Sequence, residues 1–151
     1  MKTSVAFVAF FATAIAGLVL CGQPVNAQDT PVFTEYRGVK VGMAMADVRT
    51  KFGDPKEKYD TEDDFEFSET ETARVVYGED KKVQTISIMF TGDLASAPLA
   101  KKILGEDVPA RDDGSIYKMI QYPKQGFWVS YVKTTGAAPM VIVTMQRMPS
   151  E

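Results

Sequence analysis

Carboxylates, Lys, Ser and Tyr are the side chains of this sequence that remain as candidates for catalysis. The 151-residue chain contains 20 Asp and Glu residues, no His, and a single cysteine, Cys21. Catalysis by serine–histidine or cysteine–histidine pairs is therefore excluded. Zinc sites built on His or Cys are excluded for the same reason. The sequence also lacks a glycine-rich phosphate loop and a dinucleotide-binding fingerprint.

The densest group of carboxylates lies in residues 60–71, which contain seven acids. Hard cations bind clustered carboxylates, but this stretch lacks the fixed, glycine-punctuated spacing of a calcium loop. A carboxylate pair for glycoside hydrolysis would come from Asp60, Asp63, Glu66, Asp112 or Asp113. Nothing in the sequence fixes the separation that such a pair needs. We interpret residues 60–71 as a solvated loop with an edge strand, and we predict no catalytic residue, no metal site and no cofactor. A small carboxylate-dependent hydrolase is kept as an alternative.

Two close methionine pairs, Met43 with Met45 and Met145 with Met148, have spacings that a copper carrier could use. Thioether sulfur is a ligand for Cu(I). Methionine is also a flexible filler of irregular cores, and no His accompanies these pairs. Core packing is the preferred interpretation, and a methionine-based copper carrier is the alternative.

The first 27 residues have the pattern of a signal peptide. A short basic start is followed by an uncharged, mostly apolar run over residues 5–20, which is shorter than a membrane-spanning helix. We predict cleavage after Ala27 and export, with the periplasm as the preferred compartment. A secreted protein, and a lipoprotein anchored at Cys21, are the alternatives.

Removal of residues 1–27 takes away Lys2 and no acid, so that 16 basic and 20 acidic residues remain. This negative balance predicts no binding to nucleic acid. The only cysteine leaves with the signal peptide, so the remaining domain has no disulfide. We also predict no transmembrane span after cleavage.

The periodicity of apolar residues predicts two helices and a set of antiparallel strands. Met45, Val48 and Phe52 form one apolar stripe of a helix, which Gly53 ends. A second helix is predicted over residues 94–104, with Asp93 or Ser96 as its cap, and Gly105 ends it. Strands are predicted around residues 65–67, 74–77, 83–90, 116–122, 127–133 and 140–147.

These elements predict an α+β fold, with an antiparallel sheet of about six strands and two helices packed on one face. Residues 28–37 are interpreted as a flexible leader and residues 38–148 as a single domain. Helix and three strands occur twice in the same order, so residues 38–92 and 93–148 are possible tandem units. Chance similarity of two α+β units is the alternative.

The first helix carries a motif within residues 38–55. Its characteristic positions are Gly42, Met43, Asp47, Val48, Phe52, Gly53 and Pro55. The motif resembles the start of the SmpA/OmlA (BamE-like) exported proteins, and the tandem plan resembles the related β-lactamase-inhibitor-protein-like architecture. Two departures are Ala44, where the family has a capping Ser or Thr, and the lack of a convincing lipid-bearing cysteine. The resemblance implies a non-enzymatic protein-binding module of the cell envelope.

Aromatic residues concentrate in the second half of the chain, and these predict a protein interface on the outer side of the sheet. The candidate residues are Tyr122, Trp128 and Ser130, on the assumption that the Trp128 side of strand 127–133 is exposed. We expect the partner to be an envelope protein. The alternative is an inhibitor or effector that docks on an enzyme.

Overall fold

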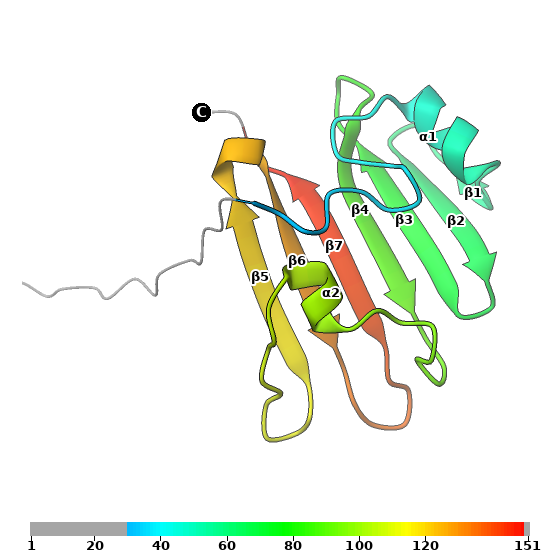
Figure 1. Ribbon diagram of the computed structural model, residues 1–151. Coiled ribbons are helices and arrows are strands. Elements are labelled where there is room, and N and C mark those ends of the chain that lie inside the picture. The colour runs from blue at the N-terminus through cyan, green and yellow to red at the C-terminus, as the bar shows by residue number, and fades with distance from the viewer. Residues whose placement is uncertain (1–29, 150–151) are drawn as a thin grey trace, which may run out of the picture.

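Seven antiparallel strands and two short α-helices make up the described part of the chain, residues 30–149 of a computed structural model (Figure 1). The helices are α1 (Met45–Phe52) and α2 (Ala100–Leu104), and a 3-10 helix, η1, covers Pro123–Gln125. The strands are β1 (Glu57–Lys58), β2 (Glu62–Ser68), β3 (Glu71–Tyr77), β4 (Val83–Phe90), β5 (Ile116–Tyr122), β6 (Phe127–Lys133) and β7 (Val141–Arg147). The predicted signal peptide, with Cys21 and the cleavage site at Ala27, lies outside the described residues.

The α+β class and the antiparallel sheet are confirmed, but the predicted number of six strands is too low. The strand order is β1-β2-β3-β4-β7-β6-β5, and every neighbouring pair is antiparallel. The additional strand is β1, whose two residues pair with Asp63 and Asp64 of β2. Two residues are too few for an alternating pattern, so periodicity does not detect this strand.

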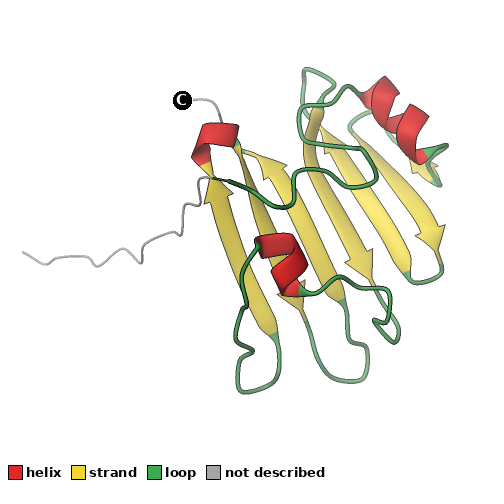
Figure 2. Cartoon of the chain, viewed as in Figure 1, coloured by secondary structure: helices red, strands yellow, loops and turns green. Residues whose placement is uncertain are grey.

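The core lies on one face of the sheet, which we call the inner face. Residues at alternate positions of the strands are buried there, including Val75 of β3, Ile88 of β4 and Val129 of β6. Val48 of α1 and Leu104 of α2 belong to the same cluster of buried residues. Figure 2 shows how short both helices are beside the strands. Most of the buried apolar surface is therefore contributed by the sheet.

The first helix matches its prediction closely. It begins at Met45 and ends at Phe52, and Gly53 follows with a φ of 88°. This is a backbone conformation that glycine adopts readily and other residues rarely adopt. Ala44 makes no side-chain capping hydrogen bond, as expected from the missing Ser or Thr.

The second helix is shorter than predicted. It covers only Ala100–Leu104, and residues 94–97 form turns instead. Pro98 disfavours helical backbone in the residue before it. The Asp93 carboxylate accepts a hydrogen bond from the Ala95 N–H, a local turn that competes with the predicted role as a helix cap. The predicted stop at Gly105 is confirmed, with a left-handed φ of 78°.

The second half of residues 28–37, which we interpret from the sequence as a flexible leader, makes defined contacts with the domain. Tyr36 and Val39 exchange two main-chain hydrogen bonds. Phe33 and Tyr36 pack against the core, and the Tyr36 ring lies edge-on to Phe52 and Phe67. The polar composition of the segment concealed these two aromatic rings, which bury enough apolar surface to order it.

Buried tyrosines make the fold sensitive to alkaline pH. Burial, followed by a hydrogen bond to Glu71, raises the pKa of Tyr36 from 10.0 to about 12. Burial also raises the pKa of Tyr77, Tyr122 and Tyr131. The unfolded chain therefore loses protons that the folded chain keeps, and the free energy of unfolding falls as the pH rises above 10.

We expect the protein to keep its stability up to pH 10 and to lose it progressively between pH 10 and pH 12. Tyrosinate absorbance and far-ultraviolet circular dichroism, followed together during a pH titration, measure this. A Tyr36→Phe variant should lose part of the pH dependence. The prediction would be contradicted if every tyrosine ionised at a pH well below the pH at which the protein begins to unfold.

Candidate interaction surface

The face of the sheet opposite the buried core, which we call the outer face, presents side chains in three rows across six strands. The strand registers define the members of each row. The first row is Glu62, Val76, Thr85, Gln146, Trp128 and Gln121. The second is Asp64, Arg74, Ser87, Thr144, Ser130 and Met119. The third is Glu66, Thr72, Met89, Ile142, Val132 and Tyr117.

The charges on the outer face are confined to one end of the sheet. Twelve residues of β4, β7, β6 and β5 face outward in these rows, and none of them is charged. All except Ser130 are at least partly exposed. The acids Glu62, Asp64 and Glu66 stand on β2, with Glu57 beside them on β1. Only Lys56 and Arg74 oppose them there, so this end is net negative while the rest of the face is neutral.

The third row is the most apolar part of the outer face. Met89 is 38% exposed and Tyr117 is 51% exposed, and both are among the exposed large hydrophobic residues of the described chain. Ile142 and Val132 lie between them in register. This continuous apolar row is typical of a surface that is covered by a protein partner.

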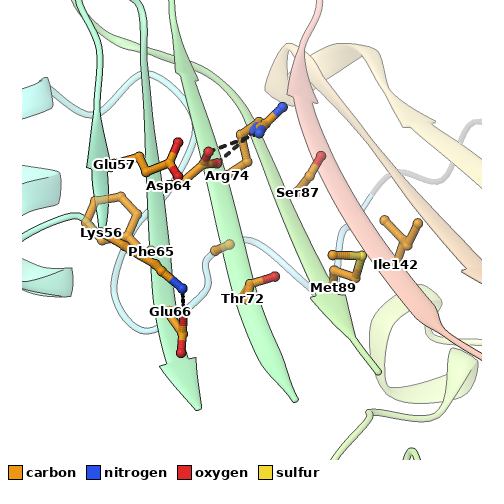
Figure 3. Close-up of a pocket in the computed structure, with 11 residues that line it drawn as sticks. Lys56, Glu57, Asp64, Phe65, Glu66, Thr72, Arg74, Ser87, Met89 and Ile142 are labelled. Atoms are coloured by element: carbon orange, nitrogen blue, oxygen red, sulfur yellow. Dashed lines mark hydrogen bonds and ion pairs between the residues drawn. The ribbon is translucent and has the colours of Figure 1, made fainter. Parts of the chain in front are cut away.

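A hollow of about 600 Å³ lies in the outer face where its charged and apolar parts meet (Figure 3). Arg74 donates two hydrogen bonds to the Asp64 carboxylate, at 2.7 and 3.0 Å. Glu66, also on the outer face of β2, forms an ion pair with Lys56, which immediately precedes β1. Met89 and Ile142 close the hollow from β4 and β7. The hollow is therefore lined by fixed ion pairs on one side and apolar side chains on the other.

The structure separates the three residues that the sequence predicted as an interface. Trp128 and Ser130 are on the outer face of β6, because Phe127, Val129 and Tyr131 are buried on the inner face. Trp128 is partly exposed, whereas Ser130 is only 7% exposed. Tyr122 is fully buried on the inner face. Its inclusion is an error, because position 122 of β5 has the inward parity of Ile120.

The acidic residues of the stretch 60–71 are held in ion pairs rather than gathered around a cation position. Asp63 is fully buried and accepts hydrogen bonds from Arg49 and Tyr77. On the outer face, Asp64 pairs with Arg74, and Glu66 pairs with Lys56. Within residues 30–149 no group of three or more Asp, Glu, His or Cys residues has a geometry that could hold a metal ion.

Four further residues of the hydrolase and copper-carrier alternatives serve local structure. The Asp113 carboxylate accepts hydrogen bonds from the hydroxyl and the N–H of Ser115, and these bonds lower its pKa. Met145 is fully buried in β7, and Met43 and Met45 pack against the core. These contacts fit the interpretation of the methionines as core residues.

No protein-family model, no curated protein and no solved structure matches this chain. Among residues 30–149, no helix combines the length and the apolar character needed to cross a bilayer.

Sequence reasoning missed the apolar row of Met89, Ile142, Val132 and Tyr117. Each of these residues has outward parity in a strand whose bounds the sequence predicts well. Their alignment across four strands depends on the strand order and register, and neither is contained in the period of any single strand.

Proposed function

We propose that this protein is an exported, non-enzymatic protein-binding module, and that it binds its partner through the outer face of the sheet. The observation that carries the proposal is the uncharged surface of twelve outward residues on β4, β7, β6 and β5. Depletion of charge, with aromatic and methionine side chains, distinguishes the centre of a protein interface from ordinary surface. Trp128, Met89 and Tyr117 are the members best suited to anchor a partner.

The proposal includes a tandem architecture, with both helices packed on one face of the sheet. Corresponding elements begin at residues 45 and 100, 62 and 116, 71 and 127, and 83 and 141. The two halves meet where β4 pairs with β7, so the strand order of one half mirrors that of the other. Such an arrangement follows from two helix-plus-three-strand units related by a local twofold axis.

Ion pairs in the two halves support the same architecture. In the first half, inward-facing Asp63 of β2 pairs with Arg49 of α1 at 2.8 Å. In the second half, Lys118 of β5 pairs with Glu106, which follows α2, at 2.7 Å. The first pair links the first full strand of its half to the helix, and the second links it to a residue just after the helix, with the charges exchanged. This similar placement is in keeping with a duplication.

The family resemblance adds a location and a class to the proposal. A SmpA/OmlA-like protein would reside in the cell envelope, and its partner would be another envelope protein. The same surface would equally serve an inhibitor that docks on an enzyme. The identity of the captured partner distinguishes these two roles.

Affinity capture from an envelope extract tests the proposed function. The full-length chain would be expressed, and the form that the cell produces from it would be purified and used as bait. The variants Ile142→Lys and Lys102→Glu would be prepared in the same way. Ile142 lies in the apolar row, whereas Lys102 is exposed on α2. A lysine at the centre of an apolar interface should cost about 2 kcal/mol or more, a loss of about 30-fold in affinity.

We expect one dominant protein to be enriched with the original chain and with Lys102→Glu, and to be lost with Ile142→Lys. Quantitative mass spectrometry of the eluates measures the enrichment. Equal capture by both variants would contradict binding through the outer face.

A further inference from the structure

The two edges of the sheet are protected to very different degrees. At one edge, β1 is only two residues long and β2 carries a register shift between Glu66 and Ser68. Acidic side chains crowd this edge. Short edge strands, bulges and charges are the devices that prevent a sheet from pairing with another chain.

The opposite edge strand, β5, lacks the short length, the register shift and the outward charges that protect the β1 edge. Its seven residues, Ile116–Tyr122, pair with β6 without a register shift and include no proline. The only charged residue is Lys118, which faces inward and is paired with Glu106. The outward residues Tyr117, Met119 and Gln121 are uncharged and at least partly exposed. Such a strand is a template for pairing with a further strand.

The connection that precedes β5 leaves the free side of this strand without main-chain partners. This connection covers residues 105–115. Among the described residues, 30–149, the main-chain hydrogen bonds within it are local, from Gly114 N–H to Arg111 O and from Arg111 N–H to Ser115 O. Val108 packs against the core and Glu106 reaches inward-facing Lys118. These contacts hold the connection on the inner side of the sheet.

We propose that β5 pairs antiparallel with β5 of a second copy of this chain, forming a twofold-symmetric dimer with one continuous sheet. The inference does not depend on the function proposed above. A twofold axis at Met119 places Ile116 opposite Tyr122 of the copy, Tyr117 opposite Gln121, and Lys118 opposite Ile120. Each pair then lies on the same face in both copies, and no like charges stand directly opposite each other.

The chain already contains a strand pairing of this kind. β4 and β7, the last strands of the two halves, pair antiparallel about Ser87 and Thr144, whose hydroxyl oxygens lie 3.2 Å apart. Because the β1 edge is blocked by its charges and its short strand, pairing through β5 stops at two copies and does not grow into a filament. The dimer joins the two uncharged outer surfaces into one.

Sedimentation velocity over a wide concentration range, on the protein as processed from the full-length chain, tests the proposal. We expect a reversible monomer–dimer equilibrium. The variant Met119→Lys places two lysines directly opposite each other at the twofold axis and should weaken the dimer about tenfold or more. The matched variant Met89→Lys adds the same charge to the outer face away from the β5 edge and should leave the equilibrium unchanged.

A cysteine variant gives an independent readout. Under mild oxidation, Met119→Cys should form a disulfide-linked dimer, because residues opposite each other in an antiparallel pair are close enough for this bond. Met89→Cys and the original chain are the controls. A protein that stays monomeric at every soluble concentration would overturn the proposal. Equal weakening by Met119→Lys and Met89→Lys, in variants with native circular dichroism, would also overturn it.

Discussion

Replacement of Asp63 by alanine is expected to lower the free energy of unfolding by about 3 kcal/mol, because it breaks a buried ion pair. Asp63 is fully buried, and Arg49 donates two hydrogen bonds to its carboxylate, at 2.8 and 2.9 Å. Tyr77 donates a third, at 2.8 Å. The variant leaves the guanidinium and the phenol without an acceptor. Since the Arg49 side chain is 25% exposed, the expected loss is near the lower end of the range for such pairs.

Asp64 provides a matched control at the next position of the same strand. Its carboxylate also accepts two hydrogen bonds from an arginine, but on the outer face, where the Arg74 side chain is 57% exposed. Ion pairs this exposed contribute about 0–1 kcal/mol. Urea unfolding of Asp63→Ala and Asp64→Ala should therefore give clearly different midpoints. Similar midpoints would mean that burial does not set the strength of the Asp63 pair.

Two buried tyrosines should respond differently in stability when each is replaced by phenylalanine. The Tyr77 hydroxyl donates to the Asp63 carboxylate, and loss of a hydrogen bond to a charged group costs about 1.5–3 kcal/mol. Tyr122 is fully buried, and its hydroxyl oxygen is the one buried side-chain polar atom without a partner among the described residues. Removal of an unpaired buried hydroxyl takes away a desolvation penalty of about 1–3 kcal/mol.

We therefore expect Tyr77→Phe to be destabilised and Tyr122→Phe to be unchanged or more stable. Thermal unfolding followed by circular dichroism measures both, and the two variants remove the same atom from the same residue type. Clear destabilisation by Tyr122→Phe would show that the hydroxyl has a partner in solution, such as an internal water.

Six of the seven strands were predictable because each of them presents a period of two on its own, whereas β1 is too short to do so. The bounds of β5, β6 and β7 agree with prediction to within one residue, since turn residues bracket each strand. The helix at 45–52 was predictable from its apolar stripe and from Gly53. The second helix was overestimated because the turn at Asp93 and the effect of Pro98 outweighed helix propensity.

The candidate surface was only partly predictable. The parity of β6 places Trp128 and Ser130 on one side of the sheet but does not decide which side is exposed, and a parity error placed buried Tyr122 beside them. The apolar row depends on the pairing of β4 with β7, two strands that are far apart in the sequence. The charge polarity of the outer face arises in the same way, from strand order. Neither the strand order nor the register is encoded in the pattern of one strand.

Site-specific photo-cross-linking in the producing cell tests the use of the outer face most directly. A photoreactive residue would replace Trp128 or Met89 on this face, and Lys102 on α2 would serve as the control. Cross-links from positions 128 and 89 to the same protein, with none from 102, are the predicted result. Cross-links from position 102 alone, or none from either outer position, would contradict the proposal that this sheet face binds a protein partner.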